Sequence, residues 1–222
     1  NFTPKQRFDF TSDIPTAEQR LRSIREQMGD LSEQPRREAY QIGDEVGSFP
    51  VDGINGDFSE ADSYGEAWGA LSRVIRYAEG TSSNAGYNTM FTHKQFDGYG
   101  DHPRQLQSGG GYTSDAAGAY QFLSTTWDGA RSALGLKDFS PASQEAAARY
   151  LTQQKRSVNP DKVIKTIDEF REVMDKLAPE WASLPYSKPS PKGFGNGSSY
   201  YGQGGKSLEK LWEIYQQYTA SQ

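Results

Sequence analysis

Apolar residues recur at helical spacing through most of the chain from about residue 64 onward, which predicts a mainly helical domain. One face of the first of these helices is formed by Trp68, Leu71, Val74, Ile75 and Ala78. Gly80 stands where a left-handed C-cap would end this helix, because glycine adopts positive φ angles without a steric penalty. Glu79 is therefore predicted to be the last helical residue.

Start signals predict four more helices further along the chain. The starts are Ser124, the Ser140-Pro141 pair, the capping box of Thr166 and Glu169, and Ser207. Between the first helix and these, residues 81–113 are rich in Gly, Tyr, Asn and Thr and show no helical period. That stretch predicts a loop-rich lobe or a small antiparallel sheet. The predicted fold class is α+β, predominantly α, with two lobes of which the smaller contains the β structure.

The first 65 residues differ from the rest in being rich in charged residues, Gln, Pro and Gly. Thr16 as N-cap predicts one helix, whose narrow apolar stripe consists of Leu21, Ile24, Met28 and Leu31. An apolar stripe this narrow on a charged helix usually packs against a partner surface. The partner surface belongs to the same chain, to another copy or to a larger assembly. We therefore divide the chain into an N-terminal helical and extended segment, residues 1–65, with a docking or linker role, and a domain, residues 66–222.

Composition narrows the chemistry that the chain can perform. It contains no cysteine, which excludes a thiol nucleophile, and its histidines are His93 and His102. A zinc site needs about three ligands, and these two with Asp97 or Asp101 match no ligand motif, so we expect no metal site. There is also no Gly-x-Ser-x-Gly motif of a nucleophilic serine.

Net charge and hydropathy indicate which kinds of partner the chain does not bind. The net charge of −5 argues against a nucleic-acid partner, because binding to phosphates relies on clustered Lys and Arg. No apolar run approaches the roughly 20 residues that span a bilayer, so we expect no membrane insertion. Because the first residue is Asn and not Met, we expect the chain to be trimmed or cut from a longer polypeptide.

Carboxylate chemistry remains, and position selects Glu79 among the 29 acidic residues. A helix C-terminus carries partial negative charge, and an apolar face borders this residue, so both disfavour the ionised form and predict a raised pKa. A carboxyl group that keeps its proton near neutral pH is what protonates a glycosidic oxygen. The alternative, which periodicity by itself favours, is an ordinary glutamate at a helix end in solvent.

A series of motifs adds to this interpretation. In chain order they are residues 78–81, Gly86-Tyr87, residues 101–104 (DHPR), Gly118 with Tyr120-Gln121, Trp127-Asp128, residues 134–141 (LGLKDFSP), residues 181–185 (WASLP) and residues 201–203. With these motifs, the stretch from Tyr77 to about Tyr215 resembles the phage lambda-type endolysins, a family of lytic transglycosylases with a lysozyme-like fold. The resemblance covers roughly two thirds of the chain and implies that residues 66–222 form a lysozyme-like catalytic domain.

The resemblance also implies site residues. The catalytic glutamate of the family falls on Glu79. The implied substrate contacts are Tyr120, Gln121, Tyr201, Gln203, Asn88 and Ser183, and Asn88 stands where the family is expected to have Asp. Tyr112, Tyr120 and Tyr201, which lie in Gly-rich loops, are predicted to stack on sugars, whereas Trp127, Trp181 and Trp212 are predicted core residues.

The implied reaction uses one carboxylate on peptidoglycan glycan strands. Glu79 protonates the linkage between N-acetylmuramic acid and N-acetylglucosamine, and the muramic C6 hydroxyl then closes a 1,6-anhydro ring without water, metal or cofactor. A hydrolytic muramidase of the same fold would need a second carboxylate about 5–9.5 Å away. Asp97, Asp101 and Asp115 are the nearest by sequence, and we predict structural roles for all three, with Asp101 and His102 fixing a turn.

A hypothesis of another class makes the chain a structural or anchoring part of a phage particle, with residues 1–65 docking onto phage structural proteins. The expected location is accordingly either the virion or, after release, the periplasm and cell wall of the host.

Overall fold

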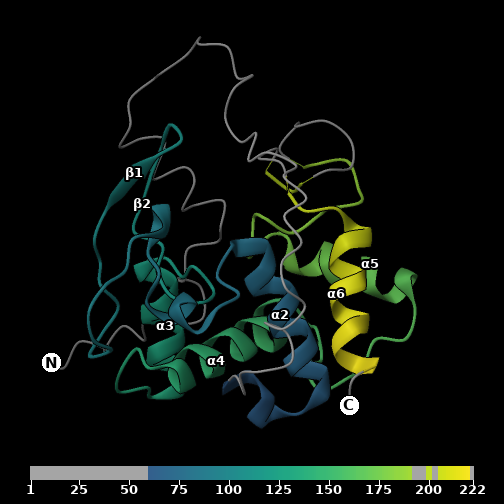
Figure 1. The fold of residues 1–222 in the computed structure, drawn as a ribbon, viewed down its shortest axis with the longest axis horizontal. Coiled ribbons are helices and arrows are strands. Elements are labelled where there is room, and N and C mark those ends of the chain that lie inside the picture. The colour runs from purple at the N-terminus through teal and green to yellow at the C-terminus, as the bar shows by residue number, and fades with distance from the viewer. Residues whose placement is uncertain (1–59, 192–198, 202–204, 221–222) are drawn as a thin grey trace, which may run out of the picture.

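The computed structural model describes residues 60–191, 199–201 and 205–220 (Figure 1). The helix predicted after Thr16, most of the proposed linker and Gln203 lie outside the described residues. The described part is mostly helical, with one small antiparallel sheet, so the predicted fold class is confirmed. No helix in these ranges combines the length and the apolar character that a membrane span needs.

The described α-helices carry the labels of Figure 1. They are α2 (Glu66–Glu79), α3 (Ser124–Leu134), α4 (Pro141–Tyr150), α5 (Ile167–Leu177) and α6 (Leu208–Ala220). Strands β1 (Gln107–Gly109) and β2 (Tyr112–Ser114) form the sheet, with Gln107 opposite Ser114. Short 3₁₀ helices cover Glu60–Tyr64, Asn84–Asn88 and Phe91–His93, and a π-helix, Leu151–Lys155, extends α4. The loop-rich β lobe that was predicted between residues 81 and 113 is confirmed in outline.

The helix ends follow the predicted cap signals. Gly80 ends α2 in the left-handed conformation, at φ 74° and ψ 27°, and its N–H bonds the carbonyl of Tyr77. The Ser140 hydroxyl accepts the Ser143 N–H at the start of α4. At the start of α5, the Thr166 hydroxyl accepts the Glu169 N–H at 3.2 Å. Each of these bonds joins residues at most three apart, which is why sequence alone locates them.

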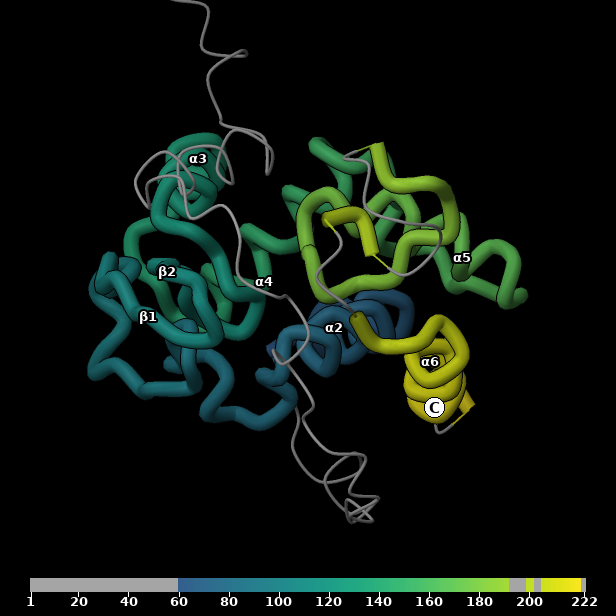
Figure 2. Tube along the Cα trace, turned by 90° about the horizontal axis from the view of Figure 1, so that it is seen from above, coloured from purple at the N-terminus to yellow at the C-terminus, as the bar shows by residue number. Residues whose placement is uncertain are grey.

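Helix α2 is central to the domain. Seen from above, it lies between the sheet with α3 on one side and α5 with α6 on the other (Figure 2). It packs on α6, while α4 contacts α3 and the 3₁₀ helix at residues 60–64. The predicted apolar face of α2 is buried, with Trp68, Val74 and Ile75 each 0% exposed. Burying such side chains stabilises the fold by about 1.5–3 kcal/mol each.

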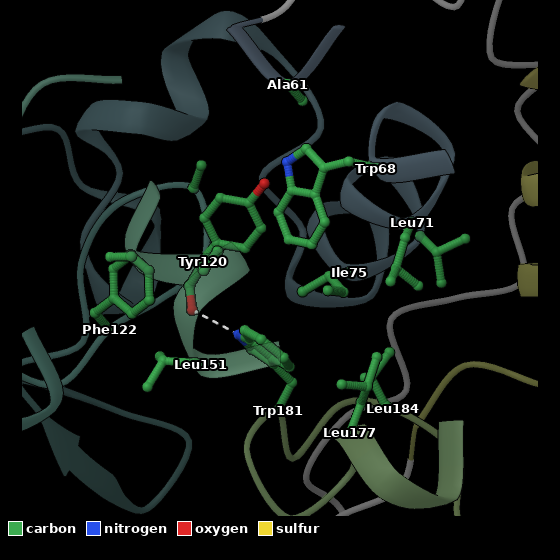
Figure 3. Close-up of a cluster of buried hydrophobic side chains, with 14 of the residues drawn as sticks. Ala61, Trp68, Leu71, Ile75, Tyr120, Phe122, Leu151, Leu177, Trp181 and Leu184 are labelled. Atoms are coloured by element: carbon green, nitrogen blue, oxygen red, sulfur yellow. Dashed lines mark hydrogen bonds between the residues drawn. The ribbon is translucent and has the colours of Figure 1, made fainter. Parts of the chain in front are cut away.

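Aromatic side chains join the two lobes in the core. Trp68 and Tyr120 stack with ring centroids 6.1 Å apart, and the Trp181 indole N–H donates to the Tyr120 carbonyl at 3.2 Å (Figure 3). Trp127 and Trp181 are buried as predicted, whereas Trp212 is only partly buried. The segment after α5 is thereby tied to the loop before α3.

The packed domain begins before residue 66. Ala61 is 0% exposed, and Asp62 accepts hydrogen bonds from Arg73 on α2 and from the Tyr218 hydroxyl on α6, both at 2.6 Å. Residues 60–64, which the sequence assigned to the N-terminal segment, thus form part of the folded unit and connect it to α6.

Candidate active site

Glu79 lies at the C-terminal end of α2, as predicted, and meets a loop that is distant in sequence. The Ser183 hydroxyl donates to Glu79 Oε1 at 2.5 Å. Ser183 follows Trp181, which the Tyr120 carbonyl holds, and a turn bond from Leu184 N–H to the Trp181 carbonyl at 3.0 Å fixes the segment. The end of α2 and the segment after α5 therefore meet at this carboxyl group.

Burial raises the pKa of Glu79 to about 7, while the hydrogen bonds from the Ser183 hydroxyl and N–H act in the opposite direction and are outweighed. The predicted raised pKa is confirmed, with burial as its cause. Within the described residues, no other carboxylate contributes to it. The residue keeps a partly exposed surface, so a substrate can reach a group that is desolvated enough to hold its proton at neutral pH.

Arg76 shapes the turn that follows Glu79, and sequence reasoning missed it. This arginine is 2% exposed, and its guanidinium donates to the carbonyls of Thr81 and Ser83, at 3.2 and 2.8 Å. Thr81 in turn donates from its hydroxyl to the Ala119 carbonyl at 2.5 Å. The available signal was a polar row at spacings of four and three on α2, formed by Ser72, Arg76 and Glu79 beside the apolar face.

A second buried glutamate, also missed, lies on α4. Glu145 is 0% exposed and accepts three hydrogen bonds, from Trp68 Nε1 at 2.6 Å, the Tyr120 hydroxyl at 2.6 Å and the Tyr87 hydroxyl at 2.7 Å. Ser72 donates to the same Tyr120 hydroxyl at 2.7 Å. Burial raises the pKa of Glu145, and the three donors work against that shift. This network connects α4 with α2 and with the 3₁₀ helix that contains Tyr87.

Two residues that were predicted to contact the substrate have buried side chains. Tyr120 is 1% exposed, because its hydroxyl binds Glu145 and its ring packs on Trp68, so it is a core residue (Figure 3). Tyr201 is 6% exposed, and its hydroxyl donates to the Pro179 carbonyl at 2.9 Å. Both rings are thus buried, whereas Tyr112, the third tyrosine that was predicted to stack on sugars, is 46% exposed on β2.

Gln121 and Asn88 are partly buried and hold the loops of the small lobe. The Gln121 side-chain N–H donates to the carbonyls of Thr89 and Gly118, both at 2.9 Å. Asn88 accepts from the Tyr99 hydroxyl at 2.9 Å and donates to the Phe96 carbonyl at 3.3 Å. Of the described residues that were predicted to bind substrate, Ser183 is the one in contact with Glu79.

The turn at residues 101–104 has the predicted structural role. Asp101 accepts from the Trp127 indole N–H at 2.9 Å and from the His102 backbone N–H at 2.8 Å. His102 is buried, which lowers its pKa; Nδ1 accepts the Arg104 N–H and Nε2 donates to the Phe122 carbonyl. A neutral ring satisfies both bonds. In the described ranges, His, Cys, Asp and Glu side chains form no group of three or more suited to a metal ion.

Two cavities border α5, and Glu79 lines neither. The larger, of about 480 Å³, lies between α5 and the start of α6 and is lined by residues that include Asp175, Lys206 and Glu209. The other, of about 270 Å³, is lined in part by Leu71 and Val173. Lys206 connects the first cavity to the site, since its N–H donates to the Ser183 carbonyl at 3.4 Å.

A mostly helical domain with a small β lobe and one proton-holding glutamate at a helix end places the protein in the class of lysozyme-like enzymes. Comparison with known proteins makes the assignment narrower. The model of the Endolysin family matches residues 69–221, so the chain belongs to the endolysins, enzymes that degrade peptidoglycan.

Similar proteins agree with this assignment. The endolysin of Escherichia phage lambda is 36% identical over 121 residues, which are 50% of this chain and 73% of that protein. The endolysin of Escherichia phage P2 is 30% identical over 161 residues, 64% of this chain and 86% of that protein.

Two solved structures extend the likeness to the fold. A bacteriophage lambda lysozyme complexed with a chitohexasaccharide has a TM-score of 0.55 at 29% identity, over 73% of this chain and 96% of that one. A second lambda lysozyme structure has a TM-score of 0.51 at 26% identity, and the match covers 75% of this chain and 96% of that one.

Proposed function

We propose that the protein is a lytic transglycosylase that cleaves the β-1,4 linkage between N-acetylmuramic acid and N-acetylglucosamine, with Glu79 as its acid and then its base. The observation that carries the proposal is the carboxyl group of Glu79, whose pKa burial raises to about 7. A group that must give up a proton and take one back within a cycle works best when its pKa is near the working pH.

The contact with Ser183 assigns the two oxygens of Glu79. Because the Ser183 hydroxyl donates to Oε1, that oxygen is an acceptor and the proton is carried on Oε2. Oε2 protonates the glycosidic oxygen, the bond from muramic C1 breaks, and its electron pair leaves with the 4-hydroxyl of N-acetylglucosamine. The acetamido oxygen of the substrate stabilises the cation at C1. Glu79 then takes the proton of the muramic C6 hydroxyl as that oxygen bonds C1, which restores the acid.

The alternative is hydrolysis by the same fold, in which water attacks C1 with help from a second carboxylate. The absence of a contribution from any other described carboxylate to the pKa of Glu79 supports the single-carboxylate route. Among the predicted contacts we retain Ser183, Gln121 and Asn88, which are partly exposed, as substrate-binding residues. The chitohexasaccharide in the lambda lysozyme complex supports a glycan strand as the ligand.

The deciding experiment is the digestion of purified peptidoglycan followed by mass spectrometry of the products. Anhydro ends, lighter than reducing ends by one water, are expected from the native protein, and no products from Glu79→Gln. Reducing ends would contradict the transglycosylase proposal in favour of the muramidase.

We further propose that the enzyme acts on the host wall after release. The similar proteins named above support this, since each carries the name of an endolysin or a lysozyme. The virion hypothesis depended on residues 1–65, most of which lie outside the described residues, and no observation favours it.

A further inference from the structure

A strained turn lies opposite the helix end that carries Glu79. Thr92 and His93 are consecutive and both have positive φ angles, 73° and 63°. Such angles are uncommon for residues other than glycine, and a β-branched residue such as Thr92 is a clear outlier there. Strained backbone of this kind persists only where surrounding contacts hold it, and it concentrates at functional sites.

Hydrogen bonds fix the turn from both ends. The Met90 N–H donates to the Lys94 carbonyl at 2.7 Å, and the His93 N–H donates to the Met90 carbonyl at 2.9 Å. On the other side, the Thr92 methyl group packs on Gly109 of β1 so closely that a Cβ there would lie 2.6 Å from it. The position of His93 is therefore determined by the small lobe.

The His93 ring is placed against Gly80, the residue that follows the acid. A Cβ on Gly80 would lie 3.2 Å from His93 Cε1, so the ring packs on the backbone directly beyond Glu79. The side chain is nevertheless exposed. Within the described part of the chain, its ring nitrogens take part in no hydrogen bond or ion pair. An exposed polar ring therefore lies beside the residue that follows Glu79.

The other flank of Glu79 carries a cation. The Lys206 ammonium lies 5.6 Å from the centre of the Tyr77 ring, and the backbone N–H of Lys206 donates to Ser183, the partner of Glu79. His93 is itself followed by an exposed lysine, Lys94. N–H donors and positive charge on both flanks favour an anionic or strongly accepting group in a substrate, although the whole chain is acidic.

We propose that His93 is a specificity-determining residue whose imidazole N–H binds the lactyl carboxyl group of the N-acetylmuramic acid held beside Glu79. The inference rests on the proposed function, because it takes the glycan strand as substrate. An imidazole ring always carries at least one N–H donor. The lactyl group is what distinguishes N-acetylmuramic acid from N-acetylglucosamine, and a chitin oligosaccharide lacks it.

The test uses the full chain and three variants. Glycine adopts the φ angle of His93 without strain, so His93→Gly is expected not to lower Tm. It is expected to raise KM for peptide-free glycan strands about tenfold, as for loss of a hydrogen bond to a charged group, with kcat changed less than twofold. His93→Asn, which tolerates the conformation and keeps an N–H donor, is expected to recover most of the affinity.

Ser157→Gly is the matched control, because Ser157 is also exposed at positive φ, 54°, but lies beyond the π-helix Leu151–Lys155. Its KM is expected to stay unchanged. The Kd of His93→Gly for chitohexasaccharide is expected to equal that of the native protein. An unchanged KM in His93→Gly, or equal weakening with both ligands, would overturn the proposal. The KM measurement does not depend on whether the products carry anhydro or reducing ends, so the two proposals fail separately.

Discussion

Glu79 and Glu145 are two buried glutamates of one domain, and burial raises the pKa of both. They differ in their surroundings. Glu145 is 0% exposed and its carboxylate accepts three donors from side chains, whereas Glu79 keeps part of its surface and has one such donor, Ser183. Many donors fix a carboxylate as a structural centre; one donor and an open side leave a proton available for chemistry.

The largest expected effect is on catalysis, in Glu79→Gln. The amide has the shape of the acid but cannot exchange a proton, so cleavage of peptidoglycan is expected to fall by about 10²–10⁴-fold. Folding is expected to be unimpaired, because a neutral amide avoids the cost of a buried charge. Initial rates of product release and urea unfolding measure the two effects. Substantial residual cleavage would show that the acid is elsewhere.

The mirror-image change, Glu145→Ala, is expected to act on stability. It leaves the donors of Trp68, Tyr87 and Tyr120 without their acceptor, and the free energy of unfolding should fall by about 4 kcal/mol. The rate per folded molecule is expected to change little at low temperature. Glu172→Gln, at an exposed site on α5, is the control and should leave unfolding unchanged. A loss of activity in a fully folded Glu145→Ala protein would contradict the purely structural role of Glu145.

The pH dependence of cleavage separates the two carboxyl groups further. The proton on Glu79 is needed for the first step, so kcat/KM is expected to decline as pH rises through about 7. Ser183 lowers that pKa, so in Ser183→Ala the decline should move to higher pH. A pH profile on soluble glycan strands records the shift. A decline that stays in place would contradict the role of Ser183.

The raised pKa of Glu79 also makes the stability of the fold depend on pH. The direction is opposite to that of a salt-bridged acid, whose pKa is lowered in the folded state. The folded state binds the Glu79 proton more tightly than the unfolded state, so this group reduces stability as pH rises from about 4.5 to about 7. The shift corresponds to about 3 kcal/mol, and Glu79→Gln should abolish it. Urea unfolding at pH 5 and pH 8, compared between the two proteins, measures the difference.

The smallest expected effect is that of Tyr120→Phe. The variant removes a hydroxyl that donates to Glu145 and accepts from Ser72, and it keeps the ring on Trp68. The free energy of unfolding should fall by about 1–2 kcal/mol with KM unchanged. A raised KM for glycan strands with unaltered stability would show that Tyr120 contacts the substrate.

The sequence predicted features whose partners are close along the chain, and it missed features whose partners are far apart. The end of α2 at Gly80 and the caps by Ser140 and Thr166 depend on neighbours within a few residues, so their signals are local. The predicted helix end singled out Glu79, and the resemblance to a family supplied its proposed catalytic role. The burial of Tyr120 was not predicted because its glycine neighbours suggested a surface loop, while its partner Glu145 is 25 residues away. Glu145 itself stands in an alanine-rich helix with no local mark of burial.

The bond between Asp62 and Tyr218 brings the first and last described segments together at the start of α2. Helix α2 has 14 residues, so this junction is about 20 Å along the helix from the acid at its other end. A fluorescent tag, a wall-binding module or a surface linker attached near residue 220 would therefore be placed far from Glu79 along the helix. The C-terminal end of α6 is accordingly a suitable point for immobilising the enzyme.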